Sequence, residues 1–114
     1  MSSVSATALS GFFASEQRLQ NAANNIANAQ SRDFRPQDVV QSADATGGVS
    51  TRVVERNPAT VPTVDRDGNV AERPNVSVEE EVVQAQVATY SAQANLKVLQ
   101  ASNQLDKYLL DIQA

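Results

Sequence analysis

The sequence contains no cysteine and no histidine. The absence of cysteine excludes disulfides, zinc–thiolate sites, iron–sulfur clusters and cysteine nucleophiles. The absence of histidine excludes Ser-His-Asp triads, histidine bases and most transition-metal sites. Catalysis could then use only carboxylates, Lys, Tyr and Ser, and no motif gathers these residues into a site. We therefore expect no enzymatic activity and no cofactor or metal.

Aromatic residues are also scarce, at 4% of 114 residues, with no Trp. Most of the apolar residues are Ala and Val, and Ala buries little area beyond one methyl group. The chain has too little side-chain volume for a thick core of its own. We expect thin, closely packed elements that partner molecules complete.

Positive charge is in deficit, with a net charge of −4. A nucleic-acid-binding surface would need clustered Lys and Arg, so we expect no nucleic-acid partner. No run approaches the roughly 18 apolar residues of a membrane helix, and the N-terminus lacks the pattern of a cleaved signal peptide. We expect no direct membrane insertion.

Residues 1–31 predict a nearly uncharged helix over residues 4–29. A seven-residue repeat with alternating gaps of four and three is typical of a coiled-coil seam. The larger apolar residues of this seam are Phe12, Leu19 and Ile26, and the interleaved small ones are Ala8, Ser15, Ala22 and Ala29.

Residues 32–76 hold all four prolines and short β-branched runs, which favour a β-rich insert arm. Asp67-Gly68 lies between Val64 and Val70 and predicts a two-residue hairpin turn. Residues 42–48 predict a loose loop. Pro58 and Pro62 limit any strand near them to an edge.

Residues 77–114 predict a second heptad helix. Ser77 and Glu80 fit a capping box, and the acidic residues 79–81 suit the positive end of a helix. The residues on the predicted seam are Val87, Ser91, Ala94, Val98, Ala101, Leu105, Tyr108 and Ile112.

The predicted fold is therefore mainly α: two terminal helices in an antiparallel coiled coil, joined by a small hairpin-bearing insert. We expect an assembly seam in which the larger apolar residues of the first helix meet Val98, Leu105 and Ile112, within or between subunits. The first helix also carries an uncharged amide face, where a solvated helix would carry charged pairs. This face, with Asn24, Asn25 and Asn28, suits burial against neighbouring chains.

Several runs of the sequence resemble those of a known protein family. The run 22–29, Ala-Ala-Asn-Asn-Ile-Ala-Asn-Ala, is similar to the N-terminal signature of the flagellar axial proteins, and 8–11, Ala-Leu-Ser-Gly, resembles their start. The entry to the second helix (74–81) and the run 93–99, Gln-Ala-Asn-Leu-Lys-Val-Leu, resemble their C-terminal pattern. The short insert is most similar to the proximal-rod members of type C.

This resemblance implies a structural subunit of the bacterial flagellar basal-body rod. Such proteins leave the cell through the flagellar type III export apparatus without a cleaved signal. They polymerise with copies of themselves and with neighbouring rod proteins into a periplasmic tube that transmits torque from motor to hook. Their terminal helices line the tube wall, which implies that the amides at Asn24, Asn25 and Asn28 contact neighbours or face the export channel.

A second hypothesis is a cytosolic helical-hairpin adaptor or a chaperone-like binding module. Such a protein functions without a polymer, and its outer helix face would be rich in charge. The first helix lacks that feature, because residues 1–31 carry only Glu16 and Arg18.

Overall fold

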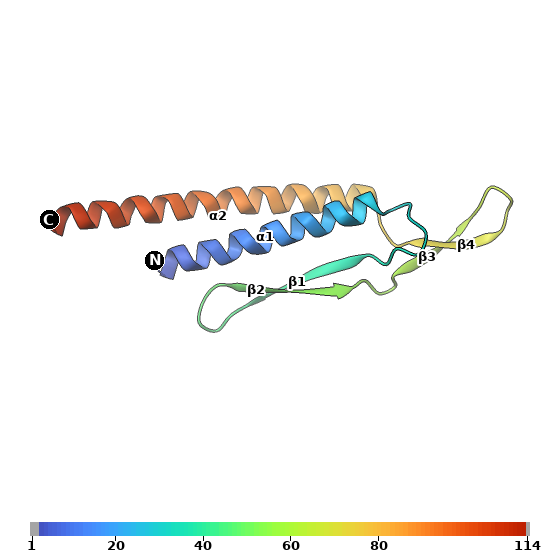
Figure 1. Ribbon diagram of the computed structural model, residues 1–114, viewed down its shortest axis with the longest axis horizontal. Helices are drawn as coiled ribbons and strands as arrows, with labels where there is room; N and C mark the ends of the chain where they lie inside the picture. The colour runs from blue at the N-terminus through green and yellow to red at the C-terminus, as the bar shows by residue number, and fades with distance from the viewer. Residues whose placement is uncertain (1–2, 114) are drawn as a thin grey trace.

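The computed structural model, which describes residues 3–113, contains two long helices lying side by side and two β-hairpins in the segment between them (Figure 1). The molecule extends 77 × 24 × 15 Å and has a radius of gyration of 19.7 Å. A compact domain of about this length has a radius near 13 Å, so the chain is elongated. The elements are α1 (Ser3–Ala27), β1 (Gln37–Ala43), β2 (Val49–Glu55), β3 (Thr60–Val64), β4 (Val70–Pro74) and α2 (Val78–Gln113).

Local capping sets the ends of the helices. The Glu80 backbone N–H donates to Ser77 Oγ over 3.4 Å, so Ser77 caps α2 as its sequence motif predicts. Three acidic residues occupy the first turn of α2. α1 ends at Ala27, where the chain tightens and the Ala29 N–H donates to the Ile26 carbonyl, three residues back. The helix therefore stops two residues before the expected position.

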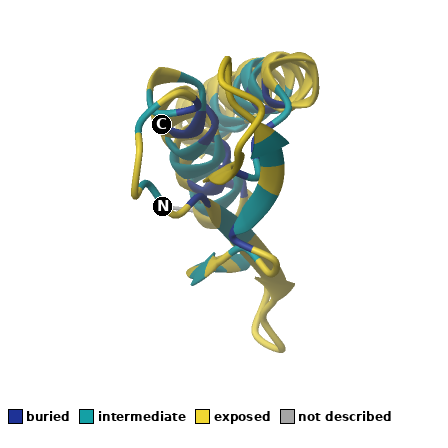
Figure 2. Cartoon of the chain, turned by 90° about the vertical axis from the view of Figure 1, so that its right-hand side faces the viewer, coloured by how far each residue is buried: buried dark blue, intermediate teal, exposed yellow. Residues whose placement is uncertain are grey.

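The two helices pack on small side chains. Ala22 of α1 and Ala88 of α2 are 1% and 0% exposed. A Cβ added to Gly11 would lie 2.8 Å from Asn95 Nδ2, so the backbone of α1 comes very close to α2 at this glycine. Figure 2 shows the buried residues gathered between the elements and the exposed ones along the outer faces. These small residues allow the two helices to approach closely, as the sequence predicted.

Hydrogen bonds fix how α1 and α2 pair along their length. Ser5 Oγ donates to Ser102 Oγ over 2.8 Å, near the start of α1. At the other end, Asn25 Nδ2 donates to Glu81 Oε1 over 3.4 Å. The start of α1 therefore lies beside the second half of α2, and the end of α1 lies beside the start of α2 (Figure 1).

The contact face of α2 is not the one that the sequence pattern favoured. Glu81, Ala88, Asn95 and Ser102 approach α1, and they repeat every seven residues. The predicted set containing Val87 lies one residue earlier, about 100° around the helix. Small and polar residues face α1 because they allow close approach and bond to it, and most of the bulkier apolar residues are exposed, with the half-buried Leu99 as an exception.

The insert forms two hairpins where the sequence predicted one. β1 and β2 pair antiparallel from Gln37–Glu55 to Ala43–Val49, and the expected loop connects them. This hairpin lies against α1, where Thr51 Oγ1 donates to Gln17 Oε1. The Val49 N–H also donates to Ser10 Oγ, over 3.1 Å. α1 is therefore covered by α2 on one side and by the first hairpin on another.

The second hairpin lies where the sequence predicted it, but residues 65–69 connect its strands, so the predicted two-residue turn is wrong. β3 and β4 pair antiparallel and end at Val64 opposite Val70. Asp65 Oδ1 accepts the Asp67 and Asn69 N–H groups over 2.9 and 2.8 Å, and Gly68 takes a positive φ of 83° in the turn. Among the described elements, β3 and β4 pack only against each other, so this hairpin projects freely from the body (Figure 1).

Candidate assembly site

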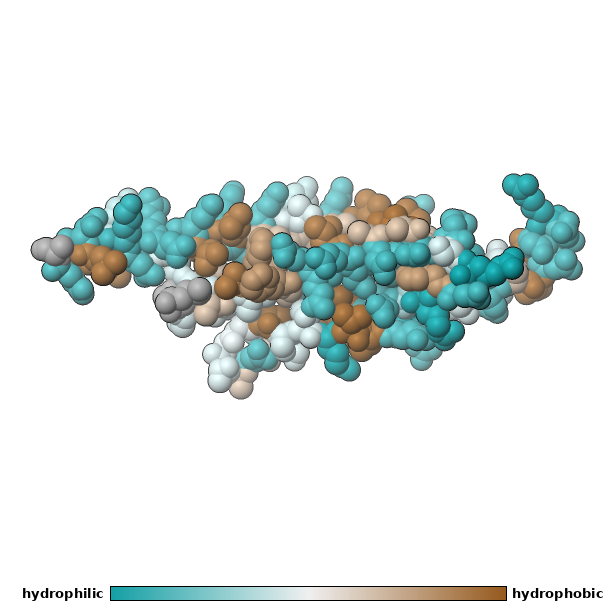
Figure 3. All heavy atoms as spheres, in the orientation of Figure 1, coloured by the Kyte–Doolittle hydropathy of each residue, from teal (hydrophilic) through white to brown (hydrophobic). Residues whose placement is uncertain are grey.

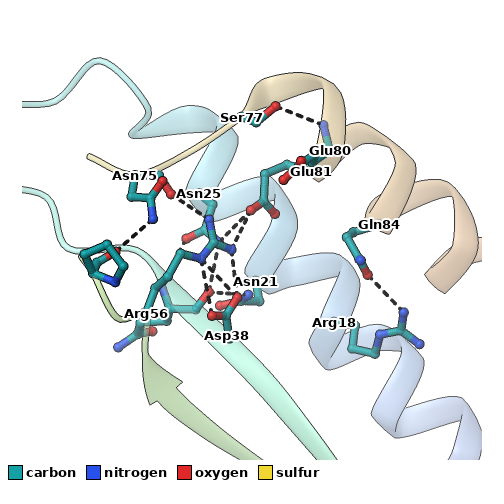
Figure 4. Close-up of polar contacts among 12 residues, drawn as sticks. Arg18, Asn21, Asn25, Asp38, Arg56, Asn75, Ser77, Glu80, Glu81 and Gln84 are labelled. Carbon is teal, nitrogen blue, oxygen red and sulfur yellow. Dashed lines mark hydrogen bonds and ion pairs between the residues drawn. The ribbon is translucent and has the colours of Figure 1, made fainter. Parts of the chain in front are cut away.

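A polar cluster joins the helices to the insert at one end of the molecule, and Arg56 is its centre (Figure 4). Arg56 Nη2 lies 2.7 Å from Asp38 Oδ1 and 2.7 Å from Glu81 Oε1. Its Nη1 donates to the Asn75 carbonyl, also over 2.7 Å. One guanidinium therefore connects β1, the segment before α2, and α2 itself.

Asn25 extends this cluster into α1. Its Nδ2 donates to the Gln37 carbonyl over 2.9 Å, and its Oδ1 accepts the Gln37 N–H over 3.3 Å. The same Nδ2 donates to Glu81, and Asn25 is 0% exposed. Asn25 therefore differs from its predicted role, because its amide is bonded inside the chain and is not available to a neighbour or a channel.

Within the cluster, the Arg56 cation pairs with the carboxylates of Asp38 and Glu81. The Glu81 side chain is 6% exposed and that of Arg56 is 20% exposed. The hydrogen bonds that Arg56 donates to Asp38, and then the one that it donates to Glu81, raise the pKa of its guanidinium above the usual value, although burial opposes this change. Arg56 is therefore a cation at neutral pH. Sequence analysis missed Arg56, because nothing near it in the sequence marks its distant partners.

The cluster borders a polar cavity of about 610 Å³ between the helices and the insert, lined in part by Arg18, Asn21 and Glu80. Every deeply buried side-chain nitrogen and oxygen in residues 3–113 has a hydrogen-bond partner. Within the same residues, no group of acidic side chains has the arrangement of a metal site. The hydrogen bonds and ion pairs of the cluster join α1, β1 and α2.

The predicted seam residues of α2 lie on its outer surface. Their exposed fractions range from 44% at Val98 to 80% at Ile112, with Val87, Leu105 and Tyr108 between these values. They are not the main contact between the two helices of one chain, although Val98 lies near Val4 and Ala8 of α1. Their assignment to a contact between copies remains a prediction.

The predicted seam residues of α1 are less exposed. Phe12 and Ile26 are half-buried, and Leu19 is 37% exposed. Of the remaining amides in the predicted set, Asn24 is exposed and Asn28 is half-buried. Asn28 Nδ2 donates to the Asn24 carbonyl over 3.0 Å, so these two amides form one local surface at the end of α1.

The uncharged surface at the end of α1 continues on the neighbouring part of α2. No charged residue lies between Val82 and Leu96, although Val83, Val87 and Tyr90 are exposed in that stretch. Figure 3 shows apolar residues gathered in the middle of the molecule and again near the far end of α2. A solvated helix face normally carries charged pairs, so this surface has the character of a contact surface.

Comparison with models of known protein families and with curated proteins finds no match to this chain. In the part of the chain that the structure describes, no helix is both long enough and apolar enough to cross a membrane.

Proposed function

We propose that this chain is a structural subunit of the bacterial flagellar basal-body rod. Its two helices form an antiparallel coiled coil in the wall of an axial tube, and the insert packs outside that wall. The subunit acts by assembly, without a catalytic step or a cofactor. It contacts further copies of itself and neighbouring rod proteins, and the tube transmits torque from motor to hook.

The observation that carries this proposal is the row of exposed apolar residues on α2. Val87, Val98, Leu105, Tyr108 and Ile112 fall on one seven-residue pattern, and all are at least 44% exposed. Such a pattern is typical of a helix face that another helix covers. α1 packs mainly on a different face of α2 and reaches this row only at Val98, so most of the row is left for a partner in another molecule.

The total surface supports the same proposal. The accessible surface is 8019 Å². A compact monomer of this mass exposes about 6,100 Å², so the chain exposes roughly 1,900 Å² more than it would if it were compact. A stable interface buries about 800 Å² on each partner. The excess is sufficient for contacts with more than one neighbour.

The flagellar assignment itself depends on the two terminal sequence motifs and their order along the chain. With that assignment, the subunit is exported by the flagellar type III apparatus without a cleaved signal and is located in the periplasmic rod. The exposed, uncharged helix faces suit a protein that acquires its full core only after export.

Mass spectrometry of isolated basal bodies tests the proposal. We expect the polypeptide in basal bodies from swimming cells, and loss of both the rod and swimming when its gene is deleted. Restoring the gene on a plasmid provides the control for that deletion. Absence of the polypeptide from intact basal bodies would overturn the proposal, and its recovery with a soluble cytosolic partner would favour the adaptor hypothesis.

A further inference from the structure

The far end of α2 carries large apolar residues that are more than half exposed. A hydrogen bond joins Ser5 to Ser102, and α2 continues from there to Gln113, about 16 Å further at 1.5 Å per residue. We call residues 103–113 the α2 tail. Figure 3 shows its apolar residues at the end of the molecule that is labelled C in Figure 1.

The tail presents its apolar residues at helix-in-groove spacing. Leu105, Tyr108, Leu109 and Ile112 follow the pattern i, i+3, i+4, i+7, and their exposed fractions are 59, 56, 51 and 80%. An amphipathic helix that inserts into a hydrophobic groove uses this spacing for its anchors. None of the four residues carries a charge, so burying them has no ionic desolvation penalty.

A matching groove lies at the opposite end of the molecule. It is lined by Ile26 of α1 and by Val82, Ala85, Gln86, Thr89 and Tyr90 of α2, and has a volume of about 260 Å³. We call it the Ile26 groove. Its lining is uncharged, and Tyr90 is 68% exposed at its edge. The four anchor residues of the tail and the lining of the groove are therefore alike in carrying no charge, and the charged tail residues Asp106, Lys107 and Asp111 lie between the anchors in the sequence.

The chain cannot close this contact on itself. Thr89 and Leu109 lie on the same straight helix, about 30 Å apart at 1.5 Å per residue. A tail can therefore reach an Ile26 groove only in another molecule that is displaced along the long axis. Joining two different surfaces in this way is a heterologous contact, and repetition of such a contact builds an open filament.

We propose that the α2 tail of one copy of this chain docks in the Ile26 groove of the next copy. The contact rests on the proposed assembly function and specifies one of its interfaces. It is directional, because each copy offers one tail and one groove. A tail–tail contact would instead use the same surface twice and would stop at a dimer.

Disulfide trapping tests this contact, because the natural chain has no cysteine and each introduced thiol reports only its own position. The variants are Leu109→Cys on the tail and Thr89→Cys in the groove, with Gln86→Cys as a second, exposed groove position. Gln41→Cys, on the exposed part of β1, is the control. Circular dichroism of each reduced variant verifies that its helices match those of the parent chain.

Mixing the tail and groove variants under mild oxidation is expected to give at least tenfold more mixed dimer than mixing the tail variant with Gln41→Cys. Adding Ile112→Asp to the tail variant should reduce the mixed dimer about tenfold. A chain that carries both Thr89→Cys and Leu109→Cys should form a ladder of oligomers. The separation of about 30 Å forbids a bond within one chain, since bridged Cα atoms lie within about 7 Å.

Two outcomes would overturn the proposal. One is a product dominated by Leu109→Cys homodimers, which indicates a tail–tail contact. The other is a yield of mixed dimer no greater than that of the Gln41→Cys control for both groove positions. The rod assignment is judged separately. If the chain is present in basal bodies but gives no mixed dimer, the rod assignment stands and the tail–groove contact is rejected. If the mixed dimer forms but the chain is absent from basal bodies, only the rod assignment is rejected.

Discussion

Arg56 shows how strongly one side chain can tie this thin molecule together. Its guanidinium bonds to Asp38, to Glu81 and to the Asn75 carbonyl, and these partners come from three separate segments. Glu81 is nearly buried, so its charge depends on Arg56 for compensation. A buried carboxylate without its cation destabilises a fold far more than the loss of an exposed pair does.

Replacing Arg56 with Met should lower the free energy of unfolding by about 3 kcal/mol, because Glu81 is left buried without a partner cation. Urea unfolding followed by circular dichroism measures the change. Adding Glu81→Leu to Arg56→Met should recover part of the loss. The matched control is Arg35→Met, which breaks an exposed pair with Glu55 and should cost less than about 1 kcal/mol. Equal losses for the two single variants would contradict the role of Arg56.

At the scale of elements, the close contact between α1 and α2 depends on Gly11. A glycine inside a helix costs about 1 kcal/mol relative to alanine, and in this position it leaves room for the Asn95 side chain. Asn95 is itself held by a hydrogen bond of 3.0 Å to the Ser91 carbonyl. The glycine is therefore explained by the packing of the two helices.

Gly11→Ala should fail to gain the roughly 1 kcal/mol that helix propensity offers, because the new methyl group collides with Asn95. In an Asn95→Ala background the same substitution should stabilise the chain by about that amount. Thermal unfolding of the four variants in a double-mutant cycle measures the coupling between the two positions. Additive effects would show that the two helices do not approach closely at Gly11.

Most elements could be predicted from local patterns in the sequence. The two helices, the Ser77 cap and the Gly68 turn follow from periodicity and capping rules that act within a few residues. The pairing of β1 with β2 was not predicted, because its strands are mostly exposed and show no clear alternation. The contact face of α2 was not predicted either, since two seven-residue patterns coexist on that helix and periodicity alone does not rank them.

At the scale of the whole molecule, the free subunit and the assembled one should differ at the surfaces that are exposed in the monomer. The large apolar residues of the α2 tail are more than half exposed, whereas Ala88 is fully buried. In the free monomer, backbone amides of residues 103–113 should exchange with solvent within seconds to minutes, and amides near Ala88 should be protected. Hydrogen-exchange mass spectrometry measures this. Strong protection throughout both helices of the monomer would contradict the expected dependence on partners.

Ile26→Asp should leave expression of the chain intact but abolish its incorporation into the rod and cell swimming. Ile26 is half-buried against α2 and lines the groove with Val82 and Ala85, so a carboxylate there opposes both folding of the helix pair and docking of a neighbour. Ile26→Leu, which conserves the volume, is the control and should swim normally. Swimming assays and basal-body composition measure the outcome, and normal swimming by Ile26→Asp would remove Ile26 from the assembly seam.

The sequence by itself determined the two helices, the Ser77 cap, the second hairpin and the absence of cysteine and histidine, because these depend on composition and on neighbours within one or two turns. Only the tertiary structure decided which stripe of α2 faces α1, which buried carboxylate pairs with Arg56, and that Asn25 is bonded inside the chain. These outcomes depend on contacts between residues far apart in the sequence, such as Arg56 with Glu81. Close packing selected the small and polar stripe, and it thereby left the larger apolar residues of α2 on the surface.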